Sequence, residues 1–167
     1  MNYKENSQNA TRFLSLTSLY VSEFEWLLGH FSVQWENYYR YHTLEGKKRK
    51  VLAYKEHGNA KLKGSEQKLF FLLVYMKTNT LQQHQAACFG LSQGKVSLIA
   101  RTLLSVLDQT LYGLKLSPFR KGEQLQSQLA THPDKVFTYD GTERGILRNL
   151  DWHAQQEEYS GKKKAIA

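Results

Sequence analysis

The segment from Leu81 to Arg101, LQQHQAACFGLSQGKVSLIAR, constrains the fold of this chain more than any other. Thr80 with Gln83 is a capping-box pattern that predicts the start of one helix. Gly90 predicts its end, because glycine adopts left-handed backbone at little cost, and Ser92 can cap a second helix. Two helices joined by so short a connection cross steeply and leave one side of the second exposed. The segment therefore predicts a helix-turn-helix.

The second predicted helix is amphipathic. Its apolar residues recur at spacings of three and four and would pack inward: Val96, Ile99, Leu103, Val106 and Leu107. The first helix would pack with Ala86, Ala87 and Phe89, of which Ala86 is small where the helices come close. The outward residues of the second helix suit base edges and phosphates. With the cap residue they form the predicted DNA contacts: Ser92, Gln93, Lys95, Ser97 and Arg101. An ordinary helical hairpin inside a larger core is the alternative.

The charge distribution also favours a nucleic-acid partner. The net charge is +8, and a strongly basic chain attracts polyanions. Residues 47–63 contain seven basic residues and one acidic residue, Glu56, which gives this segment a net charge of +6. Residues 43–64 lack periodicity and predict an irregular arm. We expect its basic run to lie on DNA phosphates or in the minor groove, with a solvated loop as the alternative; the run is Lys47, Lys48, Arg49 and Lys50.

Three further helical segments surround these features. A short helix is predicted around Arg12 to Leu19, and Ser22 with Glu25 forms a capping box that predicts a long amphipathic helix to about His42. Ser65 is predicted to cap an apolar helix, Leu69 to Met76, on which the helix-turn-helix would sit through Phe70, Leu73 and Val74. The second motif helix is expected to end near Gly113.

The chain changes character after Ser117 and Pro118. Gly122 to Thr131 predicts a short helix with Leu125 and Leu129 on one side. Lys135 to Tyr139, KVFTY, has the β-branched and aromatic content of a strand. It runs into Asp140 and Gly141, which suit either a metal-binding carboxylate at a strand end or a turn.

These segments predict a mainly α fold with four regions. They are an N-terminal helical region with the basic arm (1–64), a helix-turn-helix three-helix unit (65–116), a linker helix (117–132) and a small β-containing region (133–167). One cysteine, Cys88, excludes an internal disulfide, and His84 with Cys88 lacks the second pair that a zinc site needs. No apolar run reaches membrane-spanning length and no signal-peptide core is present, so we expect a cytoplasmic protein without a membrane partner.

Three stretches resemble, in this order, the insertion-sequence transposases of family five: FGLSQGKVS (89–97), DGTERGI (140–146) and DWHAQQEEYSGKKK (151–164). FLSLTSLYVSEFEWLL and LFFLLVYMKTNTLQQHQAACFG also resemble the N-terminal part of that family. Those proteins carry a helix-turn-helix ahead of a DDE endonuclease domain with a ribonuclease-H-like fold. The resemblance implies that Asp140 is the first catalytic, metal-binding acid of that domain. Leu98 departs from the family, which commonly has a basic residue there; it could touch a thymine methyl or pack on a neighbouring segment.

The resemblance also implies what the complete enzyme needs. Two magnesium ions held by two aspartates and a glutamate would drive DNA cleavage and strand transfer. The acidic residues after Asp140 match neither the second aspartate nor the glutamate of the family pattern. They are Glu143, Asp151, Glu157 and Glu158. We therefore expect a chain truncated early in the catalytic domain, inactive alone and binding no Mg²⁺ by itself. Because the residues after Lys164 depart from the family, we hypothesise ribosomal slippage at the codons of the lysine run; a frame-disrupted remnant is the alternative.

The function predicted from sequence is DNA binding. The leading hypothesis is the N-terminal part of a transposase that recognises the terminal inverted repeats of its own element in double-stranded DNA, with a further copy or full-length transposase as protein partner. The alternative is a free-standing helix-turn-helix transcriptional regulator or transposition inhibitor.

Overall fold

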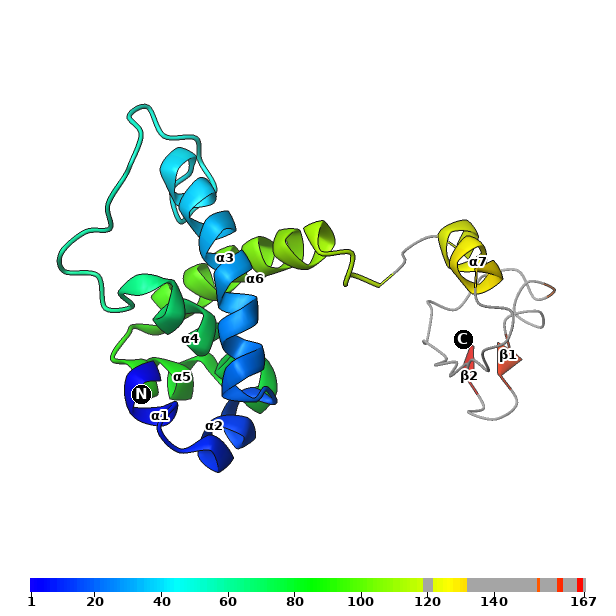
Figure 1. The fold of residues 1–167 in the computed structure, drawn as a ribbon, viewed down its shortest axis with the longest axis horizontal. Helices are drawn as coiled ribbons and strands as arrows, with labels where there is room; N and C mark the ends of the chain where they lie inside the picture. Colours follow the sequence, from blue (N-terminus) through cyan, green and yellow to red (C-terminus); the bar gives the residue numbers. More distant parts are fainter. Residues whose placement is uncertain (119–121, 132–152, 154–158, 161–164, 167) are drawn as a thin grey trace. The chain divides into compact units, whose positions relative to one another are not determined.

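The computed structural model describes residues 1–118, 122–131, 153, 159–160 and 165–166. The chain divides into two compact units, Met1–Pro118 and Phe119–Ala167. The first unit contains the helices α1 (Tyr3–Asn6), α2 (Ala10–Thr17), α3 (Val21–Tyr41), α4 (Gly64–Thr78), α5 (Gln82–Phe89) and α6 (Gln93–Gly113) (Figure 1). The predicted mainly helical class is therefore confirmed for the described residues. The boundary predicted at residue 64 falls inside the first unit.

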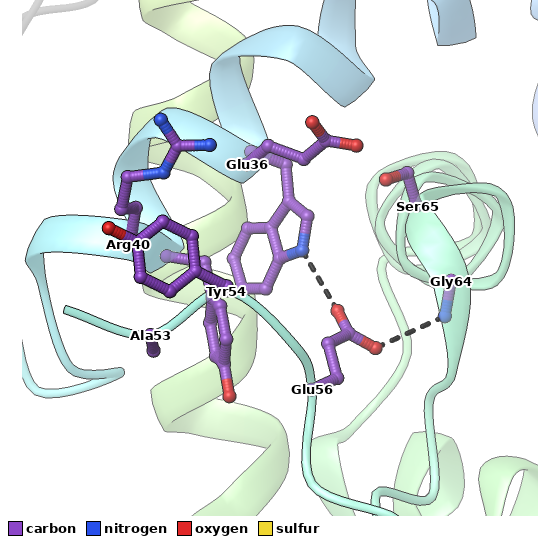
Figure 2. A pocket seen from close by; sticks show the side chains of 9 residues that line it. Glu36, Arg40, Ala53, Tyr54, Glu56, Gly64 and Ser65 are labelled. Atoms are coloured by element: carbon purple, nitrogen blue, oxygen red, sulfur yellow. Dashed lines mark hydrogen bonds between the residues drawn. The ribbon is translucent and has the colours of Figure 1, made fainter.

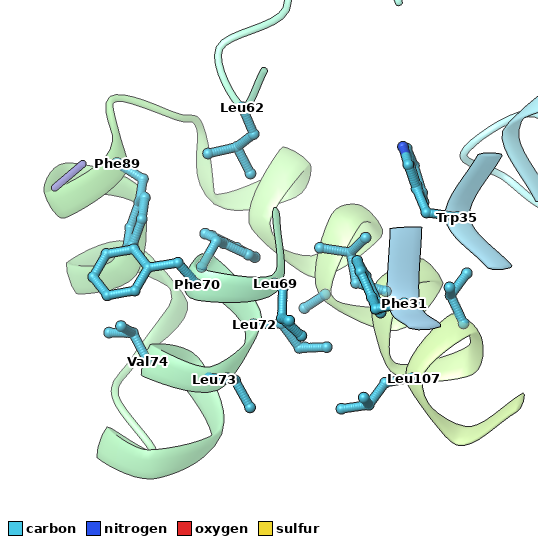
Figure 3. Close-up of a cluster of buried hydrophobic side chains, with 14 of the residues drawn as sticks. Phe31, Trp35, Leu62, Leu69, Phe70, Leu72, Leu73, Val74, Phe89 and Leu107 are labelled. Atoms are coloured by element: carbon cyan, nitrogen blue, oxygen red, sulfur yellow. The ribbon is translucent and has the colours of Figure 1, made fainter. Parts of the chain in front are cut away.

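Helix α4 lies at the centre of the first unit and contacts α1, α2, α3 and α6. Its six consecutive apolar residues, 69–74, are all buried (Figure 3). A helix that is apolar all round is expected where neighbours cover every side. Phe70, Leu73 and Val74, which were predicted as the floor of the helix-turn-helix, are all buried, and the Phe70 ring lies 6.2 Å from the Phe89 ring of α5. The helix begins at Gly64 with Lys63 as its N-cap, so Ser65 lies in the first turn and the predicted cap was wrong.

Helices α2 and α3 were predicted with small errors at their ends. Helix α2 matches the predicted short helix and ends at Ser18, which adopts left-handed backbone with φ 63°. The N-cap of α3 is Tyr20, two residues before the predicted cap Ser22, and the Tyr20 backbone amide donates to Glu23 Oε2 at 2.8 Å. The buried side of α3 carries Phe24, Leu27, Phe31 and Trp35.

The N-terminal helices and the helix-turn-helix share one hydrophobic core. Phe13 of α2 stacks on Phe70 of α4 with ring centroids 5.8 Å apart, and Phe24 of α3 meets Phe13 edge-on at 5.3 Å. On the other side of α4, Phe89 of α5 packs edge-on against Phe71 at 5.0 Å. Because α4 is buried from both sides, the first unit is held together as a whole.

The second unit is described only in part. Helix α7 (Gly122–Ala130) confirms the predicted short helix. The strands β1 (Tyr159–Ser160) and β2 (Ala165–Ile166) pair antiparallel, with Tyr159 opposite Ile166. The predicted strand Lys135–Tyr139 and the candidate ligand Asp140 lie outside the described residues, so the ribonuclease-H-like start stays a prediction. Within the described part of the chain, no helix combines the length and apolarity needed to cross a membrane.

Candidate nucleic-acid interface

Helices α5 and α6 form a helix-turn-helix joined by three residues, Gly90 to Ser92. Gly90 has φ 64°, and its amide donates to the carbonyl of Ala86. The Leu91 amide reaches the same carbonyl at 2.9 Å, so two consecutive amides close the end of α5. Ser92 is the N-cap of α6 as predicted, although its hydroxyl makes no hydrogen bond to the first turn of that helix. Helix α5 starts at Gln82 with Leu81 as N-cap, so the predicted cap at Thr80 was wrong.

The buried side of α5 differs from the prediction at two positions. Ala86 and Phe89 are buried as expected, but Ala87 is exposed. Gln85 is buried instead, and its Nε2 donates to the Phe71 carbonyl of α4 at 3.0 Å. The apolar periodicity of the sequence could not predict this contact, because glutamine is a polar residue. The hydrogen bond fixes α5 on α4 and thereby sets the position of the turn.

Helix α6 presents one open face beside its buried stripe. Val96, Leu103, Val106 and Leu107 are buried and Ile99 is half-buried, as predicted. On the open face, Gln93 and Arg101 are exposed and Ser97 is half-exposed. Each step of four residues turns only about 40° around a helix, so these three side chains form a continuous row. This open face, defined by Gln93, Ser97 and Arg101, starts at the helix N-terminus.

The arm, residues 43–63, lies along one edge of α6. The Thr102 hydroxyl donates to the Leu44 carbonyl at 2.6 Å. A cavity of about 330 Å³ separates the two segments; its lining includes Lys95, Leu98 and Ile99 of α6 and Leu44 and Leu62 of the arm. Leu98 therefore packs toward a neighbouring segment. Lys95 is exposed at the same edge, between the open face and the arm.

The basic residues of the arm divide into two kinds. Arg49 is half-buried: its Nε donates to the carbonyls of Tyr39 and His42, both at 2.9 Å, and its guanidinium lies over the Tyr39 ring at 4.7 Å. Lys47, Lys48 and Lys50 are exposed. A pairing of His42 with Lys48 closes a small loop just before Arg49. Arg49 thus fixes the arm to α3, while the three lysines project from it into solvent.

An ion pair between a buried lysine and a partly buried glutamate anchors the other end of the arm. Lys68 of α4 is 6% exposed, and its Nζ lies 2.5 Å from Glu56 Oε1. Trp35 Nε1 donates to the same oxygen at 3.0 Å, and the Gly64 amide donates to Oε2 at 3.2 Å (Figure 2). Burial raises the pKa of Glu56, but the charge of Lys68 and the hydrogen bonds from Lys68, Trp35 and Gly64 together outweigh it, so the pKa is lowered. Burial lowers the pKa of Lys68 despite Glu56.

Sequence reasoning missed this anchor. Glu56 and Lys68 are twelve positions apart across an irregular segment, beyond any local spacing rule. The one signal was that Glu56 is the single acid among the seven bases between residues 47 and 63. Within the described residues, no group of three or more His, Cys, Asp or Glu side chains is placed to hold a metal ion. The predicted ligand Asp140 lies outside them.

The three helices around this interface match a known family. Residues 60–113, which are 54 of the 167, match the family described as the helix-turn-helix of DDE superfamily endonuclease. The match begins just before α4 and ends at the last residue of α6. It supports DNA binding by a protein of the DDE transposase type, and it does not extend to Asp140. No curated protein and no solved structure matches the chain.

Proposed function

We propose that this chain is the DNA-binding N-terminal part of an insertion-sequence transposase and that it recognises the terminal inverted repeats of its own element. One observation carries the proposal. The segment that is similar to the helix-turn-helix of DDE endonucleases is also the segment that presents Gln93, Ser97 and Arg101 on an open helix face. Terminal repeats are the DNA that such a domain must find before any strand is cut.

Recognition would place the N-terminal half of α6 in the major groove. Gln93 can pair with an adenine edge, Ser97 with a base edge or a phosphate, and Arg101 with guanine or a phosphate. Ser92 at the helix N-terminus and Lys95 would hold the backbone, where the helix dipole also favours phosphate. Lys47, Lys48 and Lys50 would hold phosphates at the flank, on an arm that Arg49 keeps in place. Phosphate contacts position the protein and base contacts specify the sequence.

Catalysis is proposed for the complete enzyme, with Asp140 as one of its three acidic ligands. Bound Mg²⁺ would supply Lewis acidity at the scissile phosphodiester. We expect the chain alone to show no magnesium-dependent nicking of supercoiled plasmid, with the Asp140→Ala variant as the matched control. Nicking by the wild-type chain that disappears in Asp140→Ala would contradict the proposed inactivity and identify a nuclease.

The proposed target is tested by selecting duplexes from a random library with the purified chain. The enriched motif should occur on both sides of the chain's own gene, as an inverted pair. A motif that is absent from both flanks would contradict recognition of terminal repeats. A motif found once, upstream of a promoter, would instead support the free-standing regulator. A chain that binds the paired ends and also blocks the full-length transposase there would act as a transposition inhibitor.

A further inference from the structure

Between its two anchors the arm presents apolar side chains that the fold leaves uncovered. Val51 is 82% exposed, Tyr54 is 71% exposed and Leu52 is 42% exposed. Exposed apolar residues are ordinary when they are scattered, but these three fall within four consecutive positions. We call residues 51–54 the wedge segment. Such a cluster on a loop indicates a contact surface rather than an accident of composition.

The wedge segment is held in place before any partner binds. Arg49 fixes the chain on its N-terminal side, and the Ala53 amide donates to the Arg40 carbonyl at 3.2 Å. The Arg40 guanidinium lies over the Tyr54 ring at 5.2 Å, and Figure 2 shows these two side chains beside each other. Glu56 then ties the chain to α4. A surface that is ordered in advance loses less conformational entropy on binding than a free loop.

Charge selects the class of partner. Residues 47–55 contain five basic residues and no acidic one. Of the five, Lys47, Lys48, Lys50 and Lys55 are exposed. An apolar segment with exposed lysines on both sides in the sequence, in a chain with net charge +8, favours a polyanion over a second copy of the chain. Proteins that bind the minor groove frequently insert apolar side chains between base steps and contact the groove with basic side chains.

Both ends of the arm lie beside α6, at the edge that flanks its open face. Leu44 near its start bonds to Thr102, and Leu62 near its end lines the cavity with Leu98, so both ends of the arm meet the same edge of α6. A protein that puts a helix in the major groove meets the neighbouring minor groove at its flank. We infer that Val51 and Tyr54 insert between base pairs from the minor groove and bend the duplex. This inference rests on the proposed DNA binding.

The test compares binding to two short A·T-rich duplexes that differ by one central T·T mismatch. A mismatch lowers the cost of unstacking, so a protein that inserts side chains prefers it. We expect the wild-type chain to bind the mismatched duplex about five- to tenfold more tightly. The Val51→Ser/Tyr54→Ser variant should lose this preference while its affinity for the intact duplex changes by about twofold or less. Dyes on the duplex ends should report bending with wild type and little with the variant.

The matched control is Tyr20→Ser/Val33→Ser, which removes the same two residue types from exposed positions on or next to α3. This control should keep the preference for the mismatched duplex. If the double variant Val51→Ser/Tyr54→Ser does not fold, the single variant Val51→Ser tests the same prediction at the most exposed position. Equal affinity of wild type for both duplexes, or a preference that survives Val51→Ser/Tyr54→Ser, would overturn the inference. So would a sedimentation result in which the wedge variant alone dissociates a dimer. Binding of neither duplex by wild type would instead refute the proposed DNA binding.

Discussion

Arg49 and the lysines on either side of it have different roles, although the sequence presents them as one run. Two backbone carbonyls and an aromatic ring hold the Arg49 side chain, whereas Lys48 and Lys50 are exposed. A guanidinium with several fixed donors suits the first role. The composition of residues 47–50 could predict contact with an anionic partner. It could not predict which member the fold itself uses, because that depends on where the end of α3 leaves its carbonyls.

Replacing Lys47, Lys48 or Lys50 by glutamine should weaken binding to all duplexes alike. Each lost phosphate contact should lower the slope of log affinity against log salt concentration by about one. Fluorescence anisotropy over a series of salt concentrations measures this slope. Lys4→Gln, at an exposed lysine of α1, is the control and should leave the slope unchanged. A slope that is the same in all four variants would show that the arm does not touch phosphate.

At the scale of elements, the hydrophobic stripe of α6 and the turn at Gly90 were predicted correctly because both depend on local chemistry. Apolar side chains at spacings of three and four have one way to be buried, and a left-handed position favours glycine. The starts of α3, α4 and α5 were each misplaced by one or two residues. Several polar residues near each start could serve as caps, and tertiary packing selects among them.

Gly90→Ala should destabilise the first unit by about 1 kcal/mol. An added Cβ at Gly90 would meet no atom within 4 Å, so the cost is that of the left-handed backbone alone. Gly94, in the first turn of α6, has the same open surroundings and lacks a positive φ. Gly94→Ala should therefore stabilise the helix by about 0.5–1 kcal/mol. Urea unfolding measures both changes, and a shift of equal sign in the two variants would contradict this description of the turn.

Glu56→Gln should cost about 2 kcal/mol at neutral pH, because the buried Lys68 loses its carboxylate and keeps only the Leu62 and Gly64 carbonyls as acceptors. Glu56→Gln/Lys68→Met should cost less, since both charges are removed. The lowered pKa of Glu56 stabilises the fold above the ordinary glutamate range, and this stabilisation disappears as the pH falls through the folded-state pKa. Unfolding at several pH values should show the difference between wild type and Glu56→Gln shrinking toward acid. A constant difference would exclude the ion pair as its source.

At the scale of the whole molecule, the helix-turn-helix depends on the N-terminal helices. The sequence predicted separate regions at residue 64, because the irregular arm looks like a boundary. The structure joins them through Phe13, which stacks on Phe70 of α4 and packs edge-on against Phe24 of α3. Phe13 and Phe70 are 57 positions apart in the sequence, and no local pattern could predict their contact. Residues far outside the matched segment therefore pack against the helix that supports the helix-turn-helix.

The isolated segment 60–113 should lack a cooperative unfolding transition, because removing α2 and α3 uncovers one side of Phe70 and its neighbours. Residues 1–118 should unfold in a single transition. Thermal unfolding followed by circular dichroism distinguishes the two. A segment 60–113 that unfolds cooperatively at the temperature of residues 1–118 would show that the shared core contributes little.

The central claim is that the open face of α6 reads the DNA sequence. It is tested by the ratio of affinities for the selected duplex and a scrambled duplex, measured for wild type and for Gln93→Ala/Ser97→Ala at one salt concentration. The ratio should fall by about tenfold or more in the variant, while affinity for the scrambled duplex stays close to that of wild type because the phosphate contacts remain. Equal weakening on both duplexes, with the ratio unchanged, would contradict the claim.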